Sequence, residues 1–279
     1  MLTIHPQYIT DKLYKYFNYR SVRSIKMLIN EEKLDFDKVV ELQSSTYAEF
    51  ADRTVNELVS FGEQSSDSLL NRAAIVLNNW DRKLDTQSRG AVLFMNWYFK
   101  INSKEAFEVK FSPNSPLNTP NTLTRVSKEM LLKAAEKTIE KYGKLDVRWG
   151  DVYEINYADE SLKGGLGLSE VGSFNAGFYR PSSNNKYTLL GGSAFTSVVE
   201  FGEKVKAKGV LSYGNASQNS SPFKADQLQL LVDRKLRDIW FYPEDIDIHI
   251  SQAEINKRKD FRNTWTITID PFDAKDFDD

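Results

Sequence analysis

The sequence contains no cysteine and only two histidines, His5 and His249. The absence of cysteine excludes disulfide bridges, thiolate metal sites and cysteine nucleophiles, and it leaves the cellular compartment open. Two histidines are too few for a histidine-rich metal site, so we interpret each one as a surface or interface residue. We therefore predict a protein without a bound metal or cofactor.

Long apolar runs and a surplus of positive charge are also missing. No stretch approaches the roughly 20 apolar residues that span a membrane, and the first residues lack the basic and apolar regions of a signal peptide. With 37 Lys and Arg against 39 Asp and Glu, the formal charge is -2, which disfavours nucleic acid as a partner. The composition, 41% hydrophobic and 27% charged, is that of a globular protein.

Residues 1–142 are predicted to form a mainly helical segment. Their apolar residues recur every three to four positions, and capping residues and glycines mark the expected ends. Helices are predicted from Asp35 to Gly62, from Leu69 to Trp80, over 91–99 and from Ser127 to Tyr142. The segment 91–99 is apolar nearly all round and is expected to be buried. The proline-rich stretch 111–123 is expected to be irregular.

Residues 143–279 are predicted to form a strand-rich segment, because glycine, β-branched and aromatic residues become frequent and apolar residues alternate. Strands are predicted over 186–192, 193–202, 207–214 and 265–270. The second and third of them are expected to pair as a hairpin. A helical first half followed by a strand-rich second half indicates the α+β class.

Familiar catalytic motifs are missing from the chain. Ser183 and Lys186 match a Ser-x-x-Lys pattern, but its companion motifs are absent. The segment Gly164–Gly172 lacks the third glycine of a dinucleotide fingerprint and is expected to be a turn. Asp81 and Asp85 lie beside basic residues, and we interpret them as turn and helix-end groups. We therefore assign no catalytic residue.

Four segments form an ordered series of motifs along the chain. They are DFDKVVELQSSTYAEFADR, WDRKLDTQSRGAVLF, FSPNSPLNTPNTL and GGSAFTSVVEFGEKVKAKGVLSYGNASQNSSPFKADQLQLLVDRKLRDIWF, at residues 35–53, 80–94, 111–123 and 191–241. Together they resemble the penicillin acylase family, in particular its branch of acyl-homoserine lactone and aculeacin acylases. Any one segment is weak evidence for the family, but the ordered series of four is specific to it.

The last segment contains a polar loop, which in the family carries Gly-(Gln/Asn), then Ser-Pro-His and Asp-Gln. This chain has Phe223 where histidine is usual. The matching residues are Tyr213, Gly214, Asn215, Ser217, Gln218, Ser221, Pro222, Asp226 and Gln227. Side chains of these types order loops by forming hydrogen bonds with the backbone. Gly214 permits a close approach of another backbone segment or a positive φ. Asp226 is expected to cap the following helix. We interpret the loop as a structural latch, with substrate contact as the alternative.

The resemblance implies an N-terminal nucleophile hydrolase with an αββα sandwich, in which a precursor cleaves itself and a new N-terminal serine attacks an amide. In the family that serine and the oxyanion asparagine lie upstream of everything matched here. The chain is therefore expected to be the C-terminal part of the large chain and inactive alone. Its segments 1–142 and 143–279 would form one structural unit with the missing upstream acylase segment, which comprises the small chain and the start of the large chain.

The resemblance also implies the substrate and the location of the complete enzyme. The substrate is an N-acyl amide, with antibiotic amides, lactone signals and lipopeptides all within the family's range. The exported precursors of the family imply a periplasmic or secreted enzyme.

The roles of three residues and one alternative function stay open. Arg20 or Arg23 resembles a family arginine that supports the oxyanion asparagine, and a pair of exposed helix arginines is the other interpretation. Thr3 would become an N-terminal nucleophile if Met1 and Leu2 were removed, although the residues after it do not resemble the family's strand. A stand-alone, non-catalytic binding or structural module is the alternative to an acylase; such a protein would have no large exposed apolar patch.

Overall fold

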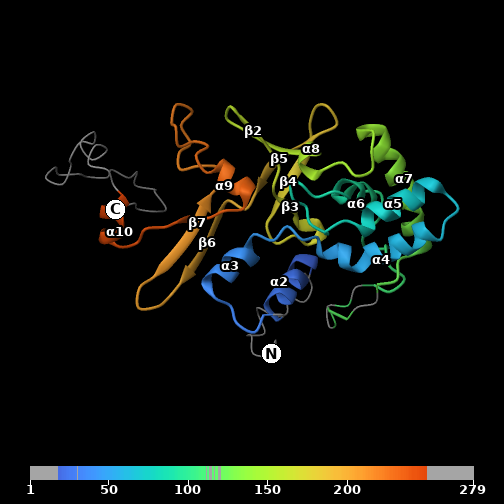
Figure 1. Cartoon of the computed structure of the whole chain (residues 1–279), viewed down its shortest axis with the longest axis horizontal. Helices are drawn as coiled ribbons and strands as arrows, with labels where there is room; N and C mark the ends of the chain where they lie inside the picture. The colour runs from blue at the N-terminus through green and yellow to red at the C-terminus, as the bar shows by residue number, and fades with distance from the viewer. Residues whose placement is uncertain are drawn as a thin grey trace, which may run out of the picture. The chain divides into compact units, whose positions relative to one another are not determined.

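The computed structural model describes residues 18–29, 31–110, 112, 115, 117–118 and 121–249. The chain divides into two compact units, residues 1–239 and residues 240–279. The second unit contains α10 (Pro243–His249), and the elements described below belong to the first unit (Figure 1). Within the described ranges, no helix is long and apolar enough to cross a membrane.

Helices fill the first part of the first unit. They are α2 (Tyr19–Ile29), α3 (Phe36–Gln43), α4 (Glu49–Glu63), α5 (Ser68–Asn78), α6 (Ala91–Tyr98), α7 (Arg125–Tyr142) and the short α8 (Trp149–Val152). The helices predicted over 91–99 and from Leu69 are confirmed, although α5 ends two residues before Trp80. The carboxylate of Asp67 caps α5 by accepting from the N–H groups of its first turn.

The helix predicted from Asp35 to Gly62 is wrong as one element, because it breaks between α3 and α4. Asp35 caps the first of the two, as expected. The chain leaves the helical path at Ser44, whose hydroxyl donates to a carbonyl one turn earlier at 2.7 Å. Tyr47 then forms an isolated bridge to the turn after α5. Serine and threonine side chains compete with helical backbone bonds, and apolar spacing alone does not reveal that competition.

The predicted start of α7 is wrong by one turn. Thr124, not Ser127, is the N-cap, and its Oγ1 accepts from the backbone N–H of Ser127 at 3.3 Å. Both residues have the hydroxyl that a cap needs, so residue type alone did not separate them. The predicted end at Tyr142 is confirmed, and Gly143 follows it with a φ of 74°.

The core of the first unit is built around α6. Every residue from Ala91 to Trp97 is buried, which confirms the prediction of a buried helix. The indole N–H of Trp97 donates to the carbonyl of Ser127 at 2.8 Å, and the Asn96 amide donates to the Thr138 hydroxyl at 2.9 Å. These bonds satisfy the buried polar groups and fix α6 against α7.

In the part of the chain that the structure describes, two sheets follow the helices, and their strands are short. They are β1 (Tyr153–Tyr157), β2 (Glu160–Lys163), β3 (Gly167–Leu168), β4 (Ala176–Pro181), β5 (Tyr187–Gly192), β6 (Phe195–Glu200), β7 (Lys206–Leu211) and β8 (Arg237–Asp238), with the helix α9 (Leu228–Asp233) before β8. The first sheet has the order β2-β1-β5-β4-β3, with parallel pairs β1–β5 and β3–β4. The second is antiparallel in the order β6-β7-β8. Helices first and strands later confirm the α+β class.

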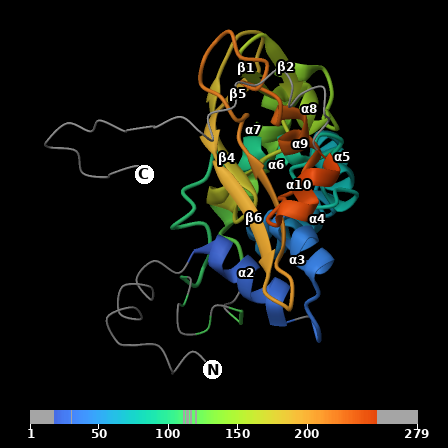
Figure 2. The same ribbon diagram turned by 90° about the vertical axis from the view of Figure 1, so that its left-hand side faces the viewer.

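The predicted hairpin is confirmed as β6 and β7, seen from a second side in Figure 2. Its register runs from Phe195 opposite Leu211 to Glu200 opposite Lys206. The strand predicted over 186–192 is confirmed as β5. The strand predicted over 265–270 lies outside the described residues.

Two clusters of apolar side chains hold the first unit together. The larger cluster packs the helices from α4 through α8 against the start of β1. There the ring of Trp149 stacks on the ring of Tyr153, with 3.5 Å between the ring centres. The smaller consists of Ile155, Leu166, Leu189, Leu228 and Leu231, and it joins the five-stranded sheet to α9. The polar loop before α9 is thus anchored at its far end by buried leucines.

Candidate functional site

A groove of about 560 Å³ runs along β6. One wall is β6 itself, and the opposite wall comes from α2, α3 and the turn before β4. The lining residues are Arg20, Val39, Gln43, Phe174, Asn175, Ser193 and residues 195–199. The groove therefore brings together segments that lie far apart in the sequence.

Among the described residues that line the groove, Arg20 alone is ionisable. Its Nε and Nη2 both donate to the carbonyl of Phe174, at 3.1 and 2.8 Å, and no described carboxylate forms an ion pair with it. Gln43 and Asn175 supply amides, and Phe195 and Val199 supply apolar surface. The groove can therefore bind a ligand through its shape, through hydrogen bonds with these side-chain amides and through positive charge. Its lining contains no acid–base pair.

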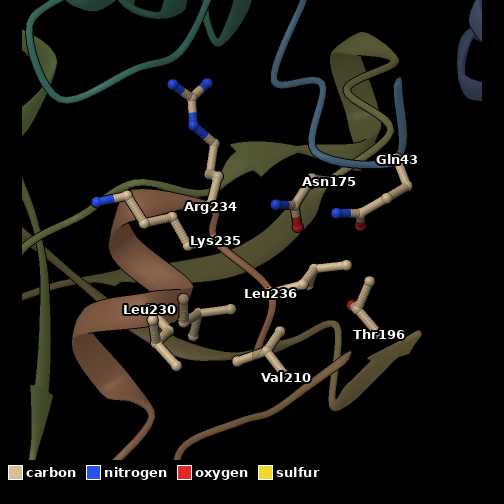
Figure 3. A pocket seen from close by; sticks show the side chains of 9 residues that line it. Gln43, Asn175, Thr196, Val210, Leu230, Arg234, Lys235 and Leu236 are labelled. Carbon is tan, nitrogen blue, oxygen red and sulfur yellow. The ribbon is translucent and has the colours of Figure 1, made fainter. Parts of the chain in front are cut away.

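A much smaller cavity of about 10 Å³ shares Gln43, Asn175 and Thr196 with the groove. Figure 3 shows its apolar side, with Val210 from β7 and Leu230 from α9, and the Arg234 side chain directed away from them. A volume of this size has room for about one water molecule. It is too small for a substrate.

The structure places Arg20 and Arg23 on the same helix, α2, but in different surroundings. Arg20 is exposed, whereas Arg23 is half-buried with its guanidinium 4.3 Å from the ring centre of Tyr47. The Nη2 of Arg23 is 3.5 Å from the hydroxyl of Ser45, and its Nε is buried without a partner. The interpretation as two exposed arginines is therefore wrong for Arg23, because α2 packs against the break between α3 and α4.

An ion cluster beside Arg23 is centred on Asp52, whose carboxylate has three donors. The carboxylate of Asp52 accepts bonds from the Tyr47 hydroxyl, from Arg82 and from Lys26. Burial favours a higher pKa for Asp52, but these donors outweigh it and hold the pKa below its ordinary value. Burial, together with the bond to Asp52, raises the pKa of Tyr47 to about 12. At neutral pH the carboxylate is charged and the phenol protonated, so the cluster ties α2 to α4 without moving protons.

Asp81 and Asp85 take different roles. Asp81 accepts from the N–H of Lys83 at 3.0 Å, which agrees with the predicted turn chemistry. Asp85 instead bonds to the buried hydroxyl of Thr46 and to the guanidinium of Arg234. This junction connects the helical segment to the end of α9, and sequence reasoning missed it because 149 positions separate Asp85 from Arg234.

The polar loop is closed by bonds between its two ends. The amide of Gln227 is buried; its Oε1 accepts from the N–H of Leu211 at 2.9 Å, and its Nε2 donates to Asn215 at 2.9 Å. The Asn215 N–H in turn donates to Asp226 at 3.2 Å. Asp226 therefore does not cap α9 as predicted: Gln227 holds the N-cap position and forms no capping bond with its side chain.

The other matched residues of the loop lie around this closure. The Tyr213 ring centre is 4.4 Å from that of Tyr157, and the Ser221 hydroxyl accepts from the N–H of Phe223 at 3.2 Å. Ser217, Gln218 and Pro222 are exposed. Gly214 makes the predicted close approach, since a Cβ there would lie 2.3 Å from the Phe223 carbonyl oxygen.

The remaining sequence motifs do not form a catalytic site in the described residues. The ammonium group of Lys186 lies 2.7 Å from Glu154 in an ion pair, and Ser183 belongs to the turn before it. The segment Gly164–Gly172 contains β3 and one 3-10 turn. No group of three histidine, aspartate or glutamate side chains in the described ranges is placed to hold a metal ion.

A model of the penicillin amidase family matches residues 3–248. The chain belongs to the penicillin amidase family. The resemblance carried by the four sequence motifs is thereby confirmed. Three curated relatives are named acyl-homoserine lactone acylase PvdQ, and each is 25% identical to this chain.

The alignments with these relatives cover only part of them. The relative from Pseudomonas fluorescens strain Pf0-1 is matched over 78% of this chain and 29% of its own length. Those from Pseudomonas fluorescens Pf-5 and Pseudomonas putida KT2440 are each matched over 63% of this chain and 24% of their own length. The chain thus spans about a quarter of the length of the curated relatives it matches.

A solved structure, a thermostable penicillin G acylase from Alcaligenes faecalis, aligns over 92% of this chain and 53% of its own chain. The sequence identity is 13% and the TM-score is 0.45.

Proposed function

We propose that this chain forms part of the body of an N-acyl amide hydrolase, and that the reacting serine and the oxyanion asparagine are supplied by acylase polypeptide outside it. The family match over residues 3–248 carries the proposal, and the relatives named as acyl-homoserine lactone acylases support it. In this role the helices and the two sheets are a scaffold that the catalytic segment completes into an αββα sandwich.

The chemistry of the described residues supports placing the nucleophile elsewhere. Amide cleavage needs a nucleophile, a base and oxyanion donors around one carbonyl. The hydroxyls of Thr46 and Ser88 contact carboxylates, yet they are only 1% and 5% exposed. The carboxylate beside Thr46 is also neutralised by Arg234. Substrate cannot reach these hydroxyls, so they stabilise the fold.

The substrate class, the cellular location and the role of the polar loop are parts of the same proposal. The names of the relatives make N-acyl-homoserine lactones the first substrates to test, with antibiotic amides and lipopeptides next. The family resemblance favours a periplasmic or secreted enzyme. The loop around Gly214 acts as a structural latch, because its side chains bond to one another and to its own backbone.

The test is complementation. The purified chain is assayed alone and after co-expression with the upstream acylase segment, and the release of free amine from N-acyl-homoserine lactones of several chain lengths is measured. We expect release only from the complex. If a folded complex forms and never hydrolyses any of these amides, the proposal is wrong, and a stand-alone binding or structural module takes its place.

A further inference from the structure

β6 is an edge strand whose open side can be defined atom by atom. It pairs with β7 on one side, and no described residue pairs with it on the other. The N–H of Ser212 donates to the carbonyl of Ala194 at 2.7 Å, so these opposite residues form a hydrogen-bonded pair. The N–H of Leu211, opposite Phe195, bonds away from β6 to the side chain of Gln227. These two bonds fix the phase of the ladder.

The phase decides which backbone groups of β6 are free. Hydrogen-bonded and non-hydrogen-bonded pairs alternate along an antiparallel ladder. Phe195, Ser197 and Val199 therefore direct their N–H and C=O groups away from β7. None of the three has a backbone partner among the described residues, so the open side offers a row of donors and acceptors in the spacing of a strand.

The groove described above runs along this open side. Its β6 wall includes all three residues, and its far wall includes Arg20 and Asn175. A neighbouring strand would lie about 4.8 Å from β6, which places it in the groove. The free backbone groups and the available space therefore coincide.

Two apolar side chains at this edge are also exposed. Phe195 is 61% exposed and Val199 is 43% exposed. Residues at alternate positions share one face of a strand, so the two lie on the same face with Ser197 between them, whereas Val198 on the other face is buried. Natural edge strands are usually protected by charge, proline or a covering segment, and residues 195–199 contain neither a charge nor a proline.

We propose that an extended strand of the companion acylase segment adds to the open edge of β6 and lies in the groove. This rests on the proposed function. The chain covers about a quarter of its relatives' length, and in the proposed function the rest of the acylase packs against it. Within the described ranges the Arg20 guanidinium bonds to the Phe174 carbonyl and to no carboxylate, so its charge favours a strand that carries an acidic side chain at that end. Alternate apolar side chains of the strand cover Phe195 and Val199.

A thiol probe tests the proposal directly, because the chain contains no cysteine. Ser197→Cys introduces one thiol at the open edge, and Ser183→Cys introduces one at the exposed turn between β4 and β5. The rate of alkylation is measured by mass spectrometry with and without the co-expressed companion segment. We expect the companion to slow alkylation of the Ser197→Cys thiol at least tenfold and that of the Ser183→Cys control less than twofold.

A matched pair of charge variants tests the same edge without a thiol. Val199→Lys places a charge in the groove, whereas Phe201→Lys changes a side chain that is 85% exposed and does not line the groove. We expect at least tenfold weaker binding of the companion for Val199→Lys and less than a twofold change for Phe201→Lys. Ser197→Pro removes an outward N–H while leaving the bonds to β7, and it should also weaken binding.

The outcomes separate this inference from the proposed function. If the complex hydrolyses amides while the Ser197→Cys thiol stays reactive and Val199→Lys binds normally, the strand addition is wrong and the proposed function stands. Protection in the chain alone that rises with its concentration would indicate a second copy at the edge and would also overturn the inference. Protection of the edge in a complex without hydrolysis supports the docking and counts against the proposed function.

Discussion

Gly214 shows how much one residue can decide in this protein. A Cβ at this position would lie 2.3 Å from the carbonyl oxygen of Phe223 and 2.6 Å from the carboxylate of Asp226. The residue type predicted either a close approach or a positive φ, and the structure selects the close approach. Phe223 and Asp226 reach Gly214 because the loop folds back on itself, and no local sequence pattern specifies that fold.

Gly214→Ala should lower the free energy of unfolding by about 1–3 kcal/mol, because backbone oxygen atoms must move to admit the methyl group. Gly191→Ala is the matched control, since nothing lies within 4 Å of a Cβ there, and it should change stability by less than about 0.5 kcal/mol. Urea unfolding of both variants measures the difference. Equal stability of the two would show that the loop is not closed in this way.

Asp151 gives a prediction for pH. Its carboxylate accepts two bonds from Arg148, at 2.8 and 3.0 Å, and one from Lys163 at 2.9 Å. The bond from Arg148, reinforced by Lys163, lowers the pKa of Asp151 to about 2. Since the folded pKa is depressed, the carboxylate stabilises the fold above its unfolded pKa of about 3.9. That contribution is lost as the pH falls toward 2.

Asp151→Asn should therefore be less stable than the wild type near pH 6, with a difference that shrinks as the pH falls from about 4 to about 2. Denaturant unfolding at several pH values gives the measurement. Asp159→Asn, at an exposed turn position, serves as the control for a lost charge. A difference for Asp151→Asn that is independent of pH would contradict the assigned ion pairs.

At the scale of the element, apolar spacing predicted α5, α6 and the β6–β7 hairpin, because each is a local pattern on one face. It failed at residues 44–46, where serine and threonine side chains end α3 while the apolar period continues. It also misplaced the start of α7, since two hydroxyl residues three positions apart both fit a cap. Hydrogen bonding of the side chain, which depends on geometry, decided both cases.

Thr124→Ala should lower the free energy of unfolding by about 0.5–2 kcal/mol, the usual cost of losing an N-cap. Thr122→Ala, an exposed position just before the helix, should cost less than about 0.5 kcal/mol. Thermal unfolding followed by circular dichroism compares the two. If the control is as costly as Thr124→Ala, the cap is not at Thr124.

At the scale of the whole molecule, the ordered motifs were enough to predict the family, but the groove could not be predicted. Its walls come from α2, α3, the turn before β4 and β6, and only the folded chain brings them together. The same holds for the junction of Asp85 with Arg234. The edge position of β6 likewise depends on the order of the strands in the sheet. The predicted pairing of β6 with β7 does not reveal that order.

The central claim is that the reacting serine lies on acylase polypeptide outside this chain. Its most direct test is the rate of amine release from N-acyl-homoserine lactones by the purified chain alone, compared with its Thr3→Ala variant. We expect no release above buffer from either protein. Turnover by the chain alone that disappears in Thr3→Ala would contradict it, because the nucleophile would then belong to this chain.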